Sequence, residues 1–282
     1  MLESLKETFS PKKKTGSEKI NFTEVRRGDT LLEAKNIVKK FPGVWRQLIL
    51  DNVNFDIKAG EVHGLLGENG AGKTVLANIL SGYYSLTEGE ILVREEPVKI
   101  RSPKDAIDLG IGMVHQELTL AERFTVSENI ALALKDPGYS QPISKVRSKT
   151  KELSDRYNLN VDPDARIDEL SAGEQQRVEI LKTLYFEPEI LIMDEPTSML
   201  TPQESEDLFS VVKELADENK GIMFITHKLE KVLEASDRIS VLRLGKMIGT
   251  KKVSETDSDE LIEMMISREV PPRPERKNVA RE

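Results

Sequence analysis

The chain has 282 residues, of which 41 are Lys or Arg and 49 are Asp or Glu, so its net charge is −8 at pH 7. This length is sufficient for a large hydrophobic core, and the acidic balance argues against a dominant nucleic-acid-binding surface. The sequence contains no cysteine, which excludes disulfides, thiolate zinc sites and a cysteine nucleophile. It contains neither an apolar run of the roughly 20 residues that span a bilayer nor a secretory signal. We therefore expect a soluble protein of the cytoplasm.

The first 60 residues divide into a polar segment and an alternating apolar one. Residues 1–30 mix charges without periodicity and are expected to form a flexible tail, in which the lysines at 12–14 are more commonly a solvated run than a membrane-binding or regulatory element. Apolar residues alternate between positions 31 and 57, which predicts antiparallel strands. Phe41 and Trp45 lie between these strands, where either ring could stack on a nucleobase or be an ordinary edge hydrophobe.

The most informative stretch follows these strands. Residues 67–74 lie between an apolar run at 62–66 and a run with helical apolar spacing at 75–80, so strand, loop and helix are predicted in that order. In such a loop, glycines allow backbone N–H groups to surround phosphate oxygens, Lys73 reaches the outer phosphates, and the Thr74 hydroxyl can ligate magnesium. The helix that begins at Lys73 adds its positive end to the same anion. The loop residues are Gly67, Glu68, Asn69, Gly70, Ala71, Gly72, Lys73 and Thr74.

The stretch that ends at residue 117 adds a polar position at the edge of the predicted sheet. Short strands are predicted at 89–93 and 98–100, and a helix begins at Ser102, with proline in its first turn. A buried strand at 111–114 then leads to Gln116. Gln116 therefore follows a strand of the central sheet, at the edge where open parallel sheets collect their ligand contacts.

Residues 118–170 have a different character and predict a helical insertion. Helical spacing at 126–134 and 144–157 is interrupted by a Pro/Gly/Ser break, and strand propensity is low. The insertion, about 118–172, ends at the motif Leu-Ser-Ala-Gly-Glu-Gln of residues 170–175. In this motif Ser171 and Glu174 have the spacing of a capping box, which explains the stretch as a helix start without any ligand.

Two further strands end in residues that suit phosphate chemistry. Residues 190–193 form an apolar run, as in a central parallel strand, and lead to Asp194 and Glu195. Asp194 could hold magnesium, directly or through water, and Glu195 could polarise a water. A second capping box at Thr201 opens a helix, and the next buried strand ends at His227, for which a phosphate contact is predicted. The chain continues with a predicted helix at 229–235, a strand at 239–242, a turn at Gly245, a helix at 259–266, and a tail or linker at 268–282.

Five motifs occur in this order: the phosphate loop, Gln116, residues 170–175, the pair Asp194 and Glu195, and His227. With them, the chain resembles the ATP-binding cassette (ABC) ATPases, which power ABC transporters. The resemblance covers residues 31–267, and GTPases, kinases and helicases with a similar phosphate loop lack the segment at 170–175. It implies an α/β fold with a P-loop NTPase core, an antiparallel β subdomain and an inserted α-helical subdomain. It also implies ATP and Mg²⁺ as cofactors.

The resemblance assigns roles around one nucleotide. Residues 67–74 are implied to bind the ATP phosphates, and Phe41 to stack on adenine, with Trp45 in reserve. Thr74, Gln116 and Asp194 are implied to serve the metal ion. The catalytic residues implied are Glu195 as general base, His227 as the residue that holds the γ-phosphate and orients the water, and Gln116 as the sensor of ion and water that also touches a membrane partner.

The family signature corresponds to Ser171, Ala172, Gly173 and Glu174, and the resemblance implies that Ser171 and Gly173 reach the γ-phosphate of ATP held by a second cassette. Three positions depart from the usual pattern: Ala172 replaces glycine, Glu174 replaces glutamine, and Thr201 replaces aspartate. The added methyl group and charge predict weaker closure around ATP and slow hydrolysis without a partner. Finer similarity is to importers of simple sugars or nucleosides, where these changes are normal.

This branch implies an ATPase at the inner face of the cell membrane, with integral membrane permease subunits as partners. An extracytoplasmic substrate-binding protein is an indirect partner, and no nucleic acid is expected. The second cassette belongs to a homodimer or to the second half of a longer chain. The alternatives are a soluble ABC ATPase that acts on DNA or the ribosome, and a regulatory module with little turnover. The first is disfavoured for two reasons. DNA-repair cassettes have long coiled coils between the phosphate loop and the signature, whereas residues 73–170 contain no sustained heptads. Translation-factor cassettes come as tandem pairs with a long charged linker, a feature that this sequence does not show.

Overall fold

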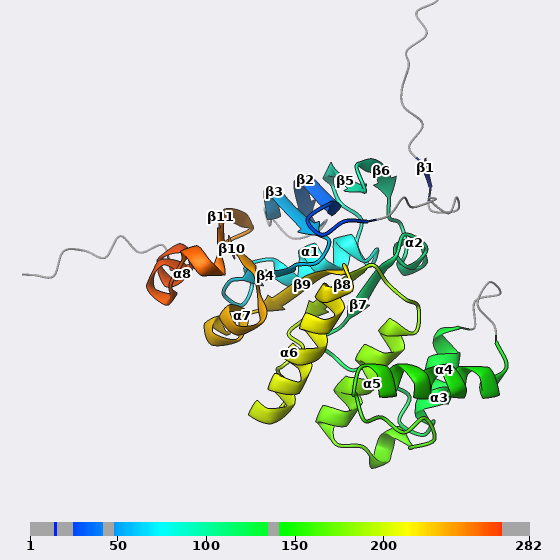
Figure 1. Ribbon diagram of the computed structural model, residues 1–282. Helices are drawn as coiled ribbons and strands as arrows, with labels where there is room; N and C mark the ends of the chain where they lie inside the picture. The colour runs from blue at the N-terminus through cyan, green and yellow to red at the C-terminus, as the bar shows by residue number, and fades with distance from the viewer. Residues whose placement is uncertain (1–13, 16–24, 42–47, 135–140, 267–282) are drawn as a thin grey trace, which may run out of the picture.

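The computed structural model describes residues 14–15, 25–41, 48–134 and 141–266. The predictions for Trp45, for most of residues 1–30 and for 268–282 concern residues outside this description. The elements are shown in Figure 1, and their order is β1 (Lys14–Thr15), β2 (Thr30–Lys40), β3 (Leu48–Lys58), β4 (Val62–Leu66), α1 (Lys73–Leu80), β5 (Glu88–Val93), β6 (Glu96–Lys99), α2 (Pro103–Asp108), β7 (Ile111–Val114), α3 (Val126–Ala133), α4 (Ile143–Arg156), η1 (Ile167–Glu169), α5 (Ala172–Leu184), β8 (Ile190–Asp194), α6 (Pro202–Asp217), β9 (Gly221–Thr226), α7 (Leu229–Ala235), β10 (Arg238–Arg243), β11 (Lys246–Lys252), η2 (Val253–Glu255) and α8 (Ser258–Met265).

The strands form two sheets. The first has the order β1, β6, β5, β2, β3, and its neighbours are antiparallel apart from the short pairing of β1 with β6. The second has the order β11, β10, β4, β9, β8, β7 and is parallel except between β10 and β11. The predicted α/β class, with an antiparallel β part beside a parallel core, is confirmed.

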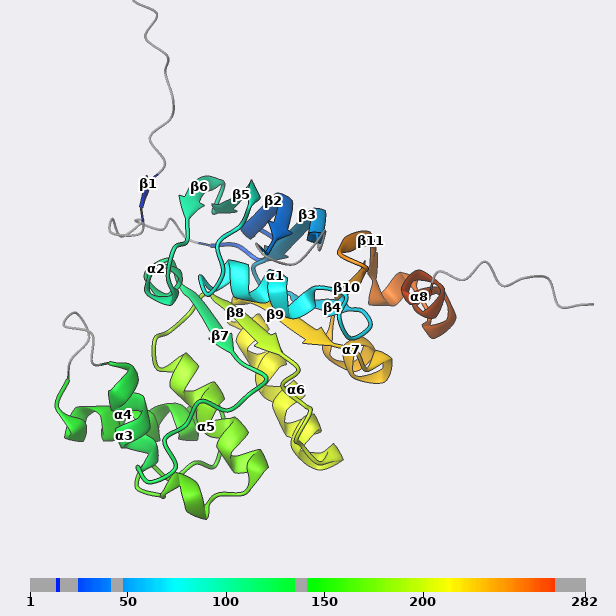
Figure 2. The same ribbon diagram turned by 180° about the vertical axis from the view of Figure 1, so that it is seen from behind.

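The central strands of the second sheet are covered on both faces. All residues of β4, β8 and β9 are buried. Leu80 of α1 belongs to the same hydrophobic cluster as Ile192 and Ile225. Leu181 of α5 and Val212 of α6 belong to a second cluster, which contains residues from the other face of the parallel sheet. Figures 1 and 2 show α1 between the two sheets and α6 across the parallel sheet from it. Strands buried on both faces read as continuous apolar runs, which is why the sequence revealed them.

The helical insertion consists of α3 and α4, which contact one another and α5. Helices α3, α5 and α6 begin at Thr125, Ser171 and Thr201, and each of these residues forms a complete capping box with a glutamate three positions later. Each box satisfies two N–H groups that the first helical turn leaves without partners. In the described part of the chain, no helix combines the length and apolar character needed to cross a membrane.

One strand was missing from the prediction. Strand β11 pairs antiparallel with β10 at the edge of the parallel sheet, whereas the sequence predicted a turn at Gly245 and no strand after it. Its residues alternate between exposed and intermediate burial, and five of the seven are Lys, Gly or Thr. An edge strand that contributes little to the core leaves a weak hydrophobic pattern, so its pairing partner specifies it more than its composition does.

A buried histidine joins the two sheets. His63, which is 0 % exposed, lies in β4. Its Nδ1 is 2.6 Å from the Asp56 carbonyl oxygen and its Nε2 is 2.8 Å from the Ser240 hydroxyl, while its ring stacks on Phe55 at 4.2 Å. A carbonyl can only accept, so Nδ1 carries the proton of a neutral ring. Burial, followed by the positive charge of Arg238, lowers the pKa of His63 to about 3.

This histidine should make stability depend on pH. The unfolded ring takes up a proton near pH 6.5, whereas the folded ring does so only near pH 3. The stabilising contribution is therefore complete above pH 6.5 and falls as the pH decreases toward 3. We expect His63→Gln to flatten the acid slope of the free energy of unfolding, measured with urea. NMR of the wild-type protein should show a His63 ring that does not titrate between pH 7 and 5. A ring that titrates near 6.5 would contradict the assignment.

Candidate nucleotide site

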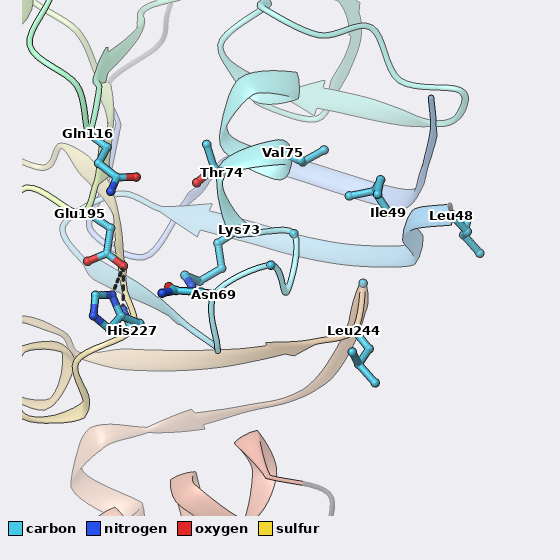
Figure 3. A pocket seen from close by; sticks show the side chains of 13 residues that line it. Leu48, Ile49, Asn69, Lys73, Thr74, Val75, Gln116, Glu195, His227 and Leu244 are labelled. Atoms are coloured by element: carbon cyan, nitrogen blue, oxygen red, sulfur yellow. Dashed lines mark hydrogen bonds and ion pairs between the residues drawn. The ribbon is translucent and has the colours of Figure 1, made fainter. Parts of the chain in front are cut away.

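The carboxyl ends of the parallel strands open onto a cavity of about 820 Å³. In Figure 3, Gln116, Glu195 and His227 gather at one end, Lys73 and Thr74 lie in the middle, and Leu48 and Leu244 lie at the far end. The polar residues follow β7, β8 and β9, and the central ones come from the loop and helix that follow β4. The lining residues are Leu48, Ile49, Asn69, Gly70, Gly72, Lys73, Thr74, Val75, Gln116, Glu195, His227, Leu244 and Gly245.

The loop between β4 and α1 presents positive charge to this cavity. Lys73 is 6 % exposed, and its ammonium donates to the carbonyl oxygens of Gly67 at 2.7 Å and Glu68 at 3.1 Å. Burial lowers the pKa of Lys73, and the charges of Glu195 and Asp194 oppose that shift. No side chain caps α1 at Gly72, so the first N–H groups of the helix remain available. Free N–H groups and an ammonium together favour an anion such as phosphate.

Asp194 lies beside this loop at the end of β8 and is 1 % exposed. Burial, followed by the charge of Glu195, raises the pKa of Asp194, and a hydrogen bond from the Thr74 hydroxyl opposes the shift. The carboxylate oxygen Oδ1 is buried without a hydrogen-bond partner among the described residues. A free buried oxygen next to a threonine hydroxyl fits a hard, oxygen-seeking cation such as Mg²⁺.

The same neighbourhood lacks the ligands to hold an ion without help. In the described ranges, no three His, Cys, Asp or Glu side chains cluster as a metal site. Thr74, Gln116 and Asp194 could therefore hold Mg²⁺ together with phosphate oxygens and water, which is how this ion is usually bound. These residues fit Mg²⁺ because each offers an oxygen atom and because Oδ1 of Asp194 has no hydrogen-bond partner among the described residues.

Glu195 and His227 form a hydrogen-bonded pair at one end of the cavity (Figure 3). Oε1 of Glu195 lies 2.9 Å from the His227 backbone nitrogen and 2.6 Å from the ring atom Nδ1, and Oε2 accepts from the Thr226 hydroxyl at 3.2 Å. Glu195 is 6 % exposed and has φ 50, a left-handed backbone conformation. This conformation turns the carboxylate from the end of β8 toward the end of β9. The pair can hold a water and accept its proton.

Not every residue of the expected site lines the cavity. Phe41 packs edge-on against Tyr84, with ring centroids 5.3 Å apart, and the Lys39 ammonium lies 4.6 Å from its ring centroid. The signature residues Ser171 to Glu174 are also outside the lining, at the first turn of α5. So are four residues beside the cavity: Gly67, Glu68, Ala71 and Asp194. The assignments of Phe41 and of the signature stay predictions. The exposure of Ser171 and Ala172 leaves them accessible to another molecule.

The apolar end of the cavity was not predicted from the sequence. Leu48 and Leu244 are 41 % and 85 % exposed, and Ile49 and Val75 complete this wall. Leu244 has φ 47, which is unusual for a leucine and places it directly before the turn at Gly245. The sequence feature that could have indicated this wall is Leu244, an apolar residue at a turn next to glycine, where polar residues are more common.

A strand, a glycine-rich phosphate loop and a helix, with a lysine and two strand-end acids around a cavity, define a P-loop nucleotide-binding α/β protein. Residues 50–198 match the family model described as ABC transporter. The chain belongs to the ABC transporter family, as the motifs predicted.

Two relatives indicate the branch. The nucleoside import ATP-binding protein NupA of Lactococcus lactis subsp. cremoris (strain MG1363) is 46 % identical over 243 residues, which are 86 % of this chain and 47 % of that protein. A putative ribose/galactose/methyl galactoside import ATP-binding protein of Hahella chejuensis (strain KCTC 2396) is 44 % identical over 247 residues, which are 87 % of this chain and 47 % of that protein. The chain thus spans about half the length of these relatives. The predicted resemblance to the sugar and nucleoside importer branch is confirmed.

A solved structure supports the fold. It is the dimeric structure of a post-hydrolysis state of an ATP-binding cassette bound to ADP and Pi, with a TM-score of 0.69 and 27 % sequence identity. The alignment covers 79 % of this chain and 99 % of that one.

The phosphate loop provides a test of its own geometry. Gly72 has φ 108, and a Cβ there would lie 2.7 Å from Cδ2 of Leu50, a core residue. Gly70 has φ 83, but a Cβ there would meet no atom within 4 Å. We expect Gly70→Ala to cost about 1 kcal/mol of unfolding free energy from backbone strain, and Gly72→Ala to cost about 3 kcal/mol because Leu50 must also move. Urea denaturation measures both, and equal losses would contradict the crowding at Gly72.

Proposed function

We propose that this chain binds ATP with Mg²⁺ and hydrolyses it as the ATPase of an ABC importer for a sugar or nucleoside. The observation that carries the proposal is the juxtaposition of Lys73 and the Glu195–His227 pair around one cavity, with the buried Asp194 carboxylate beside Lys73. These groups supply a cation for phosphate, a free oxygen for Mg²⁺ and a base for water. The relatives' names supply the substrate class, since they are import proteins for nucleosides and for ribose or galactose.

The phosphate loop binds the triphosphate in this proposal. Backbone N–H groups of residues 67–74 and the Lys73 ammonium hold the phosphate oxygens, and the first turn of α1 contributes its positive end. Thr74, Gln116 and Asp194 would hold Mg²⁺, which would supply positive charge against the charge that develops on the phosphates. The adenine then faces the apolar end of the cavity, with Phe41 as the proposed stacking ring.

Hydrolysis uses the pair at the opposite end. A water attacks the γ-phosphorus, its proton passes to Glu195, and the bond to the bridging oxygen breaks to give ADP and phosphate. As an imidazolium, His227 can donate from Nδ1 to Glu195 and from Nε2 to the γ-phosphate. His227 thereby holds the γ-phosphate and fixes the carboxylate that receives the proton.

A second cassette completes the site. Ser171 and Gly173, with Ala172 and Glu174 beside them, lie outside the cavity of their own chain. We propose that they meet the γ-phosphate in the cavity of the partner, which is a second copy or the other half of a longer protein. The dimer of the related cassette with ADP and Pi supports such an arrangement.

The membrane partner is a permease that docks next to Gln116. A second cavity of about 230 Å³ lies beside this residue, between α2, β7 and α5, and its rim includes Tyr83, Ile107 and Phe186. The half-exposed Tyr83 ring meets the His115 ring edge-on, with centroids 4.7 Å apart. An apolar groove beside Gln116 suits a helix of an integral membrane permease. The protein would then lie at the inner face of the membrane, and a substrate-binding protein would act through the permease.

The base assignment predicts separate effects on binding and turnover. Glu195→Gln keeps the size of the side chain but accepts no proton, so we expect ATP binding to persist while phosphate release falls by about 10² or more. An ATP-bound dimer should accumulate and appear in size-exclusion chromatography. Glu206→Gln, at an exposed position of α6, is the matched control and should leave turnover unchanged. Unchanged turnover in Glu195→Gln would remove Glu195 from this role.

The transport proposal is tested by capture from detergent-solubilised membranes. We expect the tagged full chain to retain an integral membrane permease, identified by mass spectrometry. Ile107→Glu places a charge in the groove and should abolish this capture, whereas Ile262→Glu, on α8 and 40 % exposed, should not. Capture of ribosomes or DNA by the wild-type chain, without a permease, would support the soluble alternative and overturn this proposal.

A further inference from the structure

The first turns of α5 and α6 lie against one another. Ser171 caps α5, with its N–H and hydroxyl donating to Glu174 Oε2, both at 2.8 Å. Thr201 caps α6 in the same way, with both groups donating to Glu204 Oε2 at 3.0 Å. The first helix carries the signature residues, and the second follows the loop that begins at Glu195.

Glu204 reaches from its own cap to the signature helix. Its second oxygen, Oε1, accepts from Nη1 of Arg177 on α5 at 3.3 Å. The same oxygen occupies the space beside Gly173, because a Cβ built there would lie 2.0 Å from it. Side chains of Arg177 and Glu204 are 24 % and 23 % exposed, so this contact is largely shielded from water.

The carboxylate of Glu204 has little freedom to move aside. Two hydrogen bonds from Thr201 hold one oxygen and Arg177 holds the other. A methyl group at residue 173 would therefore displace a side chain that closes the cap of α6. Glycine is unfavourable within a helix, by about 1 kcal/mol relative to alanine, so its presence in the first turn of α5 requires a reason. The contact with Glu204 is such a reason within a single chain.

We propose that Glu204 is a positioning residue that locks the first turn of the signature helix to the first turn of α6, so that Ser171 meets the partner's nucleotide in a fixed geometry. Glu204 also lies on the segment that leads from Glu195, through Thr197 and Thr201, to α6. The surface offered to the partner and the segment that carries the base therefore move together. This inference rests on the proposed pairing of two cassettes around ATP.

The test uses the full chain in the Glu195→Gln background and measures the ATP concentration that gives half-maximal dimer by analytical ultracentrifugation. We expect Glu204→Ala to raise this concentration by about tenfold, as for loss of one well-placed charged contact. Affinity for a fluorescent ADP analogue should stay the same, because that nucleotide site lies in one chain. Glu128→Ala opens the equivalent cap of α3 and should change dimerisation by less than twofold.

Gly173 provides the decisive comparison. Gly173→Ala should impair dimerisation because the methyl group displaces Glu204. The double variant Gly173→Ala/Glu204→Ala should lose less dimer affinity than the two single losses combined, since the part of the Gly173→Ala loss that comes from the displaced Glu204 side chain is gone. If the two losses add, Gly173 serves the phosphate alone and the proposal is wrong. It is equally wrong if Glu204→Ala dimerises like Glu128→Ala.

Failure of the underlying function would look different. If Glu195→Gln alone forms no dimer with ATP, the proposed pairing is refuted, and the positioning role is refuted with it. The contact itself is then still measurable, because Gly173→Ala should lower Tm and removal of the Glu204 side chain should remove that effect.

Discussion

The buried ammonium of Lys73 is the charge on which the cavity depends. Two carbonyl oxygens of its own loop hold it, and the carboxylates of Asp194 and Glu195 stand opposite. A cation removed from water is costly unless opposite charge is near. The acids reach it because only β9 separates β8 from β4 in the parallel sheet. The strand order thus brings Lys73, the proposed phosphate ligand, and the Glu195–His227 pair, proposed to activate water, to one cavity.

Residues 194–204 connect this cavity to the outside of the domain. Asp194 and Glu195 end β8, the following segment ends at the cap of α6, and Glu204 in that cap touches Gly173 of the signature helix. Each link is a hydrogen bond or a close contact rather than a flexible connection. Glu195, the proposed base, is therefore linked to the surface expected to face a second cassette by a segment of about ten residues. Packed contacts of this kind transmit displacements because protein interiors yield little.

The sequence predicted what depends on neighbours along the chain. The phosphate loop, the capping boxes at Ser171 and Thr201 and the apolar runs that end in acids are local patterns, and the fold contains all of them. It did not predict what depends on partners far away in the sequence. Strand β11 is defined by its pairing with β10, and the contact of Glu204 with Gly173 joins two helices across 31 positions. Such contacts follow from register and packing, which single-residue patterns do not encode.

The departure at Glu174 has a physical explanation in the cap. The carboxylate accepts two hydrogen bonds from Ser171 at the positive end of α5, and these bonds, with the charge of Arg177 adding to them, lower the pKa of Glu174. A glutamine could make the same geometry through its amide oxygen, so the departure changes charge more than shape. The positive end of α5 partly neutralises the extra negative charge of Glu174, and this offsets part of the repulsion between Glu174 and an incoming phosphate. In the proposed contact with that phosphate, the Ser171 hydroxyl would leave Glu174 and so exchange one hydrogen bond for another, and this contact would add little net driving force to closure around ATP.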